Sequence, residues 1–226
     1  NGSPAAGLPT RFTTEGEFLF LDGRPYRGRL DVYLNSGRLM IVNELHLEEY
    51  ISGIINNEIS SKWHPEAIKA QAVVARTYAV HQKNRRKDGV YHIEGSVMGQ
   101  VYSGASVEDG ASIKAVEETI GEILYYNGEP ALTVYHSNAG GRTDSSLDVW
   151  SKDYPYLRPV ESPFDSGAPR FYWEFAIPEE LLGEILNAAG YGFFGIKEIS
   201  LLERTSAGRV KTLRARDKNG KTANIS

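Results

Sequence analysis

Glu58 lies between two helical patterns and is the residue of this chain best placed for acid chemistry. A carboxyl group at the C-terminal end of a helix meets the negative end of the helix dipole, which favours its protonated form. A protonated carboxyl group is what a general acid in glycoside cleavage supplies. An exposed helix-end glutamate without a catalytic role is the alternative interpretation. Apolar residues at helical spacing precede it: Leu47, Tyr50, Ile51, Ile54 and Ile55.

A second candidate site is the segment YHSNAGGRT, residues 135–143. Its Ser-His pair suggests a hydrolase, but adjacent residues in a strand point to opposite faces and cannot readily act as nucleophile and base. We expect sugar recognition instead, with donors to hydroxyl and acetamido groups. The alternative is a structural turn in which the arginine holds a loop carboxylate. The candidate binding residues are His136, Ser137, Gly140, Gly141 and Arg142.

Three more candidates lie between these two segments. Gln71 shares a helix face with Tyr78, so both could line a cleft beside Glu58. Arg76 lies among alanines, where an anchor bonded to backbone carbonyls is the alternative to substrate binding. Tyr102 belongs to a group of loop aromatics that could either stack on sugar rings or pack in a core. The others in that group are Trp150, Tyr154 and Tyr156.

Five segments, in this order, resemble the SpoIID/LytB family of peptidoglycan-acting proteins, which includes stage II sporulation protein D and the amidase enhancers. They are VNELHLEEYISGIINNEIS, KAQAVVARTYA, GQVYSG, YHSNAGGRTDSSLDVW and PYLRPVESPFD, and they cover roughly residues 30–175. The resemblance implies that Glu58 matches the catalytic acid of the family members with lytic activity. It also implies an exported protein of the cell envelope, on the periplasmic or cell-wall side.

The activity implied by the resemblance is that of a lytic transglycosylase, which cleaves the bond between N-acetylmuramic acid and N-acetylglucosamine. Most glycosidases need two carboxyl groups. Here the C6 hydroxyl of the same muramic acid attacks intramolecularly, so one glutamate can serve as acid and base and leave a 1,6-anhydro end. Asp144 and Asp148 are candidate second carboxylates for a hydrolytic variant, although turn or cap roles suit both.

The alternative function is that of a non-enzymatic amidase enhancer that binds peptidoglycan or a partner cell-wall hydrolase. The implied partners are therefore peptidoglycan glycan strands, either intact or stripped of stem peptides, and a cell-wall amidase. The chain departs from many relatives beside the acid, where Asn56 and Asn57 replace a proline and a small residue. Ser60 likewise stands where a Met-Pro pair is common.

No cofactor and no metal are expected. Some family members carry His and Cys near GQVYSG in patterns suited to zinc. In this chain Val97, Met98 and Gly99 precede Gln100, there is no cysteine, and His92 is too isolated to replace such a set. The absence of cysteine also excludes disulfides and thiol nucleophiles.

Charge and hydropathy indicate neither a nucleic-acid-binding protein nor a membrane-spanning segment. A net charge of −4 does not indicate a basic surface that binds nucleic acid. The basic run at residues 84–87 is interpreted as a solvated helix end or loop. No segment approaches the 18 apolar residues of a membrane-spanning helix.

The fold class predicted is α+β, with antiparallel sheets and hairpins packed against a few helices in a SpoIID-like single domain over residues 11–226. Residues 1–10 are expected to be a flexible lead, and the C-terminus to be truncated relative to the family. Strands are predicted between Phe12 and Asn43 with a turn at residues 35–37, and further hairpins around Asn127-Gly128 and residues 206–208. Helices are predicted before Glu58, from Pro65, over 110–121 and over 178–189. Residues 150–170 are predicted to form an ordered surface loop.

Overall fold

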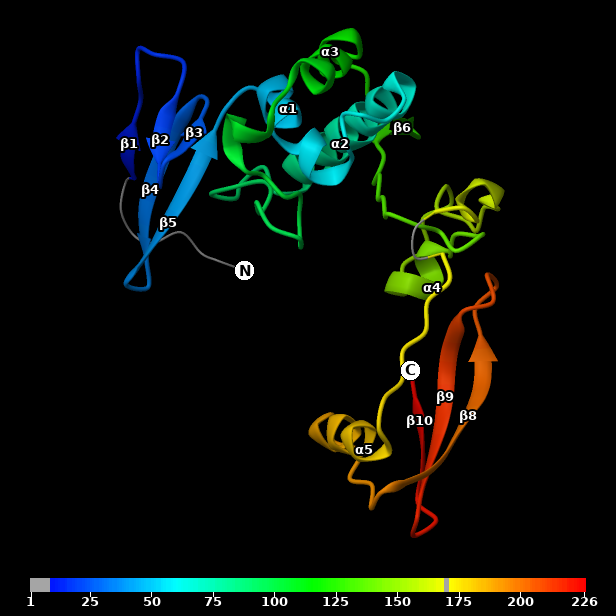
Figure 1. The fold of residues 1–226 in the computed structure, drawn as a ribbon. Helices are drawn as coiled ribbons and strands as arrows, with labels where there is room; N and C mark the ends of the chain where they lie inside the picture. Colours follow the sequence, from blue (N-terminus) through cyan, green and yellow to red (C-terminus); the bar gives the residue numbers. More distant parts are fainter. Residues whose placement is uncertain (1–8, 169–170) are drawn as a thin grey trace. The chain divides into compact units, whose positions relative to one another are not determined.

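The structure, a computed structural model, describes residues 9–168 and 171–226. Within these residues it contains five α-helices and several small antiparallel sheets, so the predicted α+β class is confirmed (Figure 1). The chain divides into two compact units, Asn1–Tyr135 and His136–Ser226, where the sequence predicted one domain. Most of the predicted lead lies outside the described residues.

The first unit begins with two small sheets. In the larger sheet, β4 (Arg29–Asn35) pairs on one side with β1 (Thr10–Phe12) and on the other with β5 (Arg38–Glu44), all antiparallel. The smaller is a hairpin of β2 (Leu19–Leu21) and β3 (Arg24–Tyr26). The predicted turn between β4 and β5 is confirmed, with positive φ at Ser36 and Gly37.

Three helices form the core of the first unit: α1 (Leu47–Glu58), α2 (Pro65–Arg85) and α3 (Gly110–Glu118). A 3-10 turn, η1 (Gly104–Val107), precedes α3. The apolar stripe of α1 is buried against the small residues of α2, whose alanines let the neighbouring helices approach closely. Burial of each large aliphatic side chain contributes roughly 1.5–3 kcal/mol. The core residues are Ile51, Ile54, Ile55, Ile68, Ala72, Ala75, Ala79, Ala115 and Val116.

The first unit ends in a short hairpin of β6 (Tyr125–Tyr126) and β7 (Glu129–Pro130). Asn127 and Gly128 both have positive φ at the turn, as the sequence predicts. The strands are shorter than predicted. After β7 the chain runs along α2, and the Thr133 hydroxyl donates to the carbonyl of Val74 at 2.8 Å instead of continuing a strand ladder.

The second unit contains the short helix α4 (Ser146–Trp150), the 3-10 turn η2 (Pro163–Asp165) and helix α5 (Glu179–Ala188). Its antiparallel sheet has the order β10-β9-β8, formed by Thr222–Ile225, Val210–Asp217 and Ile196–Arg204. The predicted helix near residue 180 and the last hairpin are confirmed, whereas α4 and β10 were not predicted. The core of this unit contains Leu186, Phe193, Ile196 and Ala215. In the part of the chain that the structure describes, no helix is both long and apolar enough to cross a bilayer.

Candidate active site

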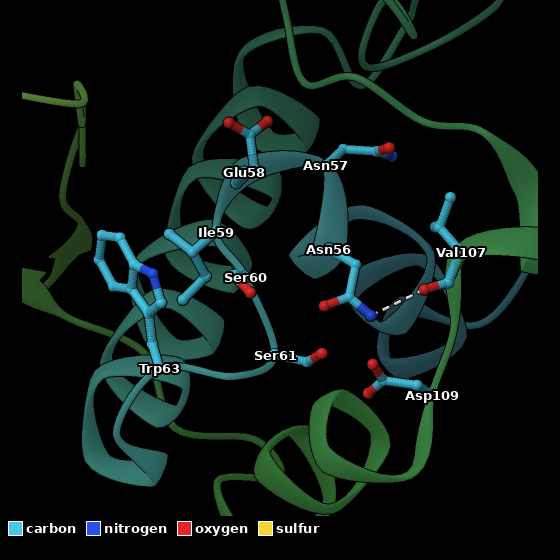
Figure 2. A pocket seen from close by; sticks show the side chains of 9 residues that line it. All are labelled: Asn56, Asn57, Glu58, Ile59, Ser60, Ser61, Trp63, Val107 and Asp109. Atoms are coloured by element: carbon cyan, nitrogen blue, oxygen red, sulfur yellow. Dashed lines mark hydrogen bonds between the residues drawn. The ribbon is translucent and has the colours of Figure 1, made fainter. Parts of the chain in front are cut away.

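Glu58 is the last residue of α1, and it borders an open pocket of about 630 Å³ (Figure 2). The helix ends there because Ile59 turns to an extended conformation, while its N–H still donates to the carbonyl of Ile55 at 2.9 Å. The Glu58 side chain is half-buried. The residues lining the pocket are Asn56, Asn57, Glu58, Ile59, Ser60, Ser61, Trp63, Val107 and Asp109.

Two asparagines attach a neighbouring loop to the end of α1. The side-chain amide of Asn56 donates to the carbonyl of Val107 at 2.7 Å, and that of Asn57 donates to the carbonyl of Val101 at 2.9 Å. Both bonds satisfy backbone acceptors in a segment outside regular helix and strand ladders. The asparagines therefore build the wall of the pocket beside Glu58.

Asp109 and Trp63 lie on opposite sides of the pocket in Figure 2. Asp109 caps α3 by accepting from the backbone N–H groups of Ala111 and Ser112 at 3.1 and 2.9 Å. The hydrogen bond from the Ser61 hydroxyl, followed by that from the Ser112 backbone, lowers the pKa of Asp109 below its usual value. The indole of Trp63 is 57% exposed, so the pocket combines a charged side with an accessible aromatic face.

Behind Glu58 lies a hydrogen-bonded group of buried polar side chains. The amide of Gln100, only 1% exposed, accepts from the hydroxyl of Tyr50 at 3.1 Å and donates to the hydroxyl of Tyr135 at 3.2 Å. Burial is the main cause that raises the pKa of Tyr135 to about 12, against the hydrogen bond from Gln100, which lowers it, and together with the negative charge of Glu58, which raises it. Burial also raises the pKa of Tyr50.

Sequence analysis did not assign site roles to Tyr50, Gln100 or Tyr135. The signal was weak, because each belonged to a segment with another interpretation: an apolar stripe, a glycine-flanked motif and a strand end. The best indication in the sequence is the glutamine between glycine and valine, because a polar side chain that is buried needs hydrogen-bond partners.

The three binding residues predicted in the first unit beside Glu58 lie in three different environments. Gln71 lies on α2 outside the set that lines the pocket, and its Nε2 is buried with no hydrogen-bond partner among the described residues. Tyr102 packs on Tyr50 with ring centroids 5.3 Å apart, and burial raises its pKa. Arg76 is fully buried and binds Glu48 through both Nε and Nη2. It also donates to backbone carbonyls, so these contacts are those of the anchor alternative.

The glycine segment, residues 136–143, belongs to the second unit, and some of its backbone N–H groups already donate hydrogen bonds within the protein. Those of Ala139 and Gly141 donate to the Asp165 carboxylate at 3.1 and 3.3 Å. Gly140 and Gly141 have φ of +62° and +88°, a region that disfavours residues with a Cβ, which explains the two glycines. The side chains of His136, Ser137 and Arg142 are exposed.

Arg209, rather than Arg142, binds the carboxylate of this loop, which belongs to Asp144. Its Nη1 donates to Asp144 at 3.1 Å, and its Nη2 donates to the carbonyls of Ala139 and, at 2.8 Å, Arg142. Asp148 accepts from the Ser145 hydroxyl at 2.8 Å in the cap of α4. Both aspartates thus have the turn and cap contacts that the sequence suggested as alternatives to a role as second carboxylate.

No group of three or more His, Asp or Glu side chains that could hold a metal ion occurs within residues 9–168 and 171–226. Among these residues no basic side chain forms an ion pair with Glu58. The acid therefore borders the pocket without a cationic partner in the part of the chain that the structure describes.

Comparison with known proteins gives a family match over residues 35–126, described as stage II sporulation protein, SpoIID. An uncharacterized protein of Brachyspira hyodysenteriae is 36% identical over 65% of this chain and 40% of its own length. The amidase enhancer of Bacillus subtilis is 36% identical over 58% of this chain and 17% of its own length. Stage II sporulation protein D of the same organism is 34% identical over 58% and 42%. The chain thus spans less than half the length of each of these relatives.

Proposed function

The chain belongs to the SpoIID family, and on that premise we propose that it is a peptidoglycan lytic transglycosylase that uses Glu58 as its acid and base. Its substrate is the glycan strand, cut between N-acetylmuramic acid and N-acetylglucosamine. It acts after export, in the cell envelope. Whether the strand carries stem peptides is a property that the assay below measures.

The observation that carries this proposal is the environment of Glu58. The carboxyl group borders an open pocket, is half-buried, and has no cationic partner among the described residues. A carboxylate fixed by an arginine or lysine would be held in its ionised form and could not act as an acid. Glu58 is free of that constraint, so it can both give and accept a proton.

The reaction needs only this one carboxyl group. Glu58 protonates the glycosidic oxygen as the bond to the anomeric carbon breaks, and the N-acetylglucosamine leaves with a new 4-hydroxyl group. The C6 hydroxyl of the muramic acid then bonds to the same anomeric carbon, and its proton returns to Glu58. The intramolecular nucleophile replaces the water and the second carboxylate of ordinary glycosidases.

The pocket also has features that suit a polysaccharide. It is open, so a long strand can cross it, and the exposed face of Trp63 suits the C–H face of a sugar ring. Tyr102 and Gln71 remain proposed contacts in the first unit. In the second unit we propose that the exposed side chains and glycine backbone bind sugar hydroxyl and acetamido groups: His136, Ser137, Gly140, Gly141 and Arg142.

The second candidate function is that of an amidase enhancer without enzymatic activity. A relative with that name, 36% identical over 58% of this chain, supports it. Such a protein would bind glycan strands or a cell-wall amidase through the same surfaces, and would not need an ionisable side chain at residue 58. The two functions therefore differ in what happens when that carboxyl group is removed.

The test is mass spectrometry of muropeptides after incubation with intact and with amidase-stripped peptidoglycan. We expect 1,6-anhydro-muramyl ends from the wild-type protein and a loss of about 1000-fold in their rate of formation for Glu58→Gln. Asp144→Asn is the matched control, because this carboxylate is bound to Arg209, and it should retain the activity. Reducing ends in place of anhydro ends would indicate a hydrolase. No product from either substrate, with glycan binding retained, would favour the enhancer.

A further inference from the structure

Helix α2 ends in a group of positively charged side chains. Lys83 and Arg85 lie in its last turn, and Arg86 and Lys87 follow directly. All four residues are exposed. Near the start of the same helix Lys69 forms ion pairs with two glutamates, whereas none of these four is paired with an acidic residue that the structure describes. Four neighbouring positive charges therefore face the solvent without a counter-charge.

The loop that follows α2 carries two large apolar side chains in the solvent. Val97 is 87% exposed and Met98 is 82% exposed. They lie in a turn that polar bonds hold together: the hydroxyl of Ser96 donates to the carboxylate of Glu94 at 2.7 Å and accepts from the backbone N–H of Met98 at 3.2 Å. The turn is therefore ordered by its own hydrogen bonds, while its apolar side chains remain outside the core of the unit.

The charged and the apolar side chains belong to one surface, because Arg86 and Met98 line the same small cavity of about 40 Å³. Tyr91, which is also exposed, lies in the segment between them. Four basic and two acidic residues occur over residues 83–98, a net charge of +2 in a chain whose total is −4. We call this the basic-apolar surface, and it consists of Lys83, Arg85, Arg86, Lys87, Tyr91, Val97 and Met98.

We propose that the basic-apolar surface docks this protein on a membrane that contains anionic lipids. The cations bind the lipid phosphates, while Val97 and Met98 enter the boundary between headgroups and acyl chains. Tyr91 suits the same boundary, since its ring is apolar and its hydroxyl is polar. In the described residues no helix could cross a bilayer, so the contact is with the membrane surface.

Two simpler explanations cover only part of this surface. The helix dipole favours Lys83 and Arg85 in the last turn of α2, but it does not explain the two cations beyond the helix. A soluble polyanion would bind all four cations, yet it would gain nothing from two exposed apolar side chains. An anionic membrane offers partners for both. No residue lines both the cavity at Arg86 and the pocket at Glu58, so the inference is independent of the proposed reaction.

The first test is sedimentation of the protein with vesicles of phosphatidylcholine, with and without an equal part of phosphatidylglycerol. We expect binding to the mixed vesicles to be about 100-fold tighter than to phosphatidylcholine alone. It should weaken when the salt is raised from about 50 mM to about 300 mM, because salt screens the charges. Arg85→Gln with Lys87→Gln should weaken it about 25-fold, and Val97→Thr with Met98→Gln about 30-fold.

The matched control removes a charge and an apolar surface elsewhere in the first unit. Lys114→Gln with Ile120→Thr changes an exposed cation of α3 and an exposed apolar residue just after that helix. This variant should bind the mixed vesicles as tightly as the wild-type protein. The formation of anhydro ends from isolated peptidoglycan should be the same in all three variants as in wild type, so a failure of the docking proposal and a failure of the proposed function are distinguishable.

A second measurement needs no loss of binding. The chain contains no cysteine, so Met98→Cys and Ile120→Cys each give a single site for an environment-sensitive fluorophore. With mixed vesicles the emission at residue 98 should shift to shorter wavelength, and that at residue 120 should not.

Three results would overturn the inference: no binding to mixed vesicles, equal binding by the wild-type protein and the two surface variants, or no emission shift at residue 98. Binding to soluble poly(glycerol phosphate) as tight as to vesicles, and unaffected by Val97→Thr with Met98→Gln, would also overturn it and indicate a polyanion site instead.

Discussion

The two ends of α1 each carry a glutamate, and the two side chains have opposite surroundings. Glu48, in the first turn, binds the fully buried guanidinium of Arg76 with its Oε2 2.7 Å from Nη2, and also accepts from the backbone N–H of Gly121 at 3.3 Å. Glu58, the last residue, borders a pocket and has no ion-pair partner among the described residues. One helix therefore presents one carboxylate to the core and another to the pocket.

The difference teaches what determines the role of a carboxylate in this unit. At Glu48 a cation and hydrogen bonds compensate the cost of removing the charge from water, so the carboxylate joins α1 to α2 and to the segment after α3. At Glu58 no cation among the described residues pairs with the carboxylate, which borders the pocket instead. The partner, rather than the residue type or the helix, separates a structural from a chemical glutamate.

The largest effect is expected from exchanging each of these carboxylates for its amide. Glu48→Gln leaves the buried guanidinium of Arg76 without a counter-charge and should lower the free energy of unfolding by about 3 kcal/mol. Glu58→Gln should change it by less than about 0.5 kcal/mol, because no ion pair is lost. Urea denaturation followed by circular dichroism measures both.

Glu66→Gln is the control for this comparison, since its side chain is 70% exposed and pairs only at the surface with Lys69. It should change stability by at most about 0.5 kcal/mol. Equal losses of unfolding free energy in Glu48→Gln and Glu58→Gln would show that the two carboxylates contribute equally to stability despite their different surroundings.

A smaller effect is expected in the second unit, where an arginine holds a loop rather than a helix. Arg209→Ala removes the donors to Asp144 and to two carbonyls of the glycine segment, and should destabilise this unit by about 2 kcal/mol. Hydrogen exchange of the amides in residues 139–144 should accelerate. Arg214→Ala, on β9 five residues further along the chain, is the control and should leave these amides protected. Unchanged protection in Arg209→Ala would mean that Asp165 alone maintains the loop.

The smallest effect concerns Asp109, the charged residue on the other side of the pocket. Its pKa is lowered in the folded state by hydrogen bonds from Ser61 and Ser112. A lowered folded pKa contributes stability that is present above the unfolded value of about 3.9 and is lost as the pH falls through the folded value. Asp109→Asn keeps a good helix cap but removes the charge.

The melting temperature of Asp109→Asn should therefore lie below that of wild type at pH 7, by an amount equivalent to about 0.5 kcal/mol. The difference should shrink as the pH falls below about 4, where the wild-type carboxylate becomes protonated. A difference that stays constant from pH 7 to pH 2 would show that the charge of Asp109 contributes nothing to the fold.

Much of the local structure was predictable from short-range chemistry. The apolar stripe ending at Glu58, Pro65 at the first turn of α2, and Asn127-Gly128 at a tight turn all have the predicted conformations. These signals depend on neighbours a few residues away. The same local reasoning applied to the candidate second carboxylates, Asp144 and Asp148. Cap and turn residues lie beside both of them in the sequence, which suggested structural roles.

The partners of the site residues were not predictable. The alternative interpretation of the glycine segment had Arg142 hold a loop carboxylate, whereas Arg209 binds Asp144 from 65 residues away in the sequence. The sequence allowed Arg76 two roles, substrate binding or a structural anchor. Its burial against Glu48 distinguishes them.

The sequence by itself indicated the four longer helices, and thereby placed a carboxyl group at the end of an apolar helix. It also carries the resemblance to the SpoIID family, whose model matches residues 35–126. Only the tertiary structure decided which polar groups meet. Tyr50 and Gln100 are 50 residues apart and Gln100 and Tyr135 are 35 apart, so their hydrogen bonds exist only after the helices have packed. Local patterns encode elements, whereas the direction of a buried hydrogen bond depends on which acceptor the fold brings to it.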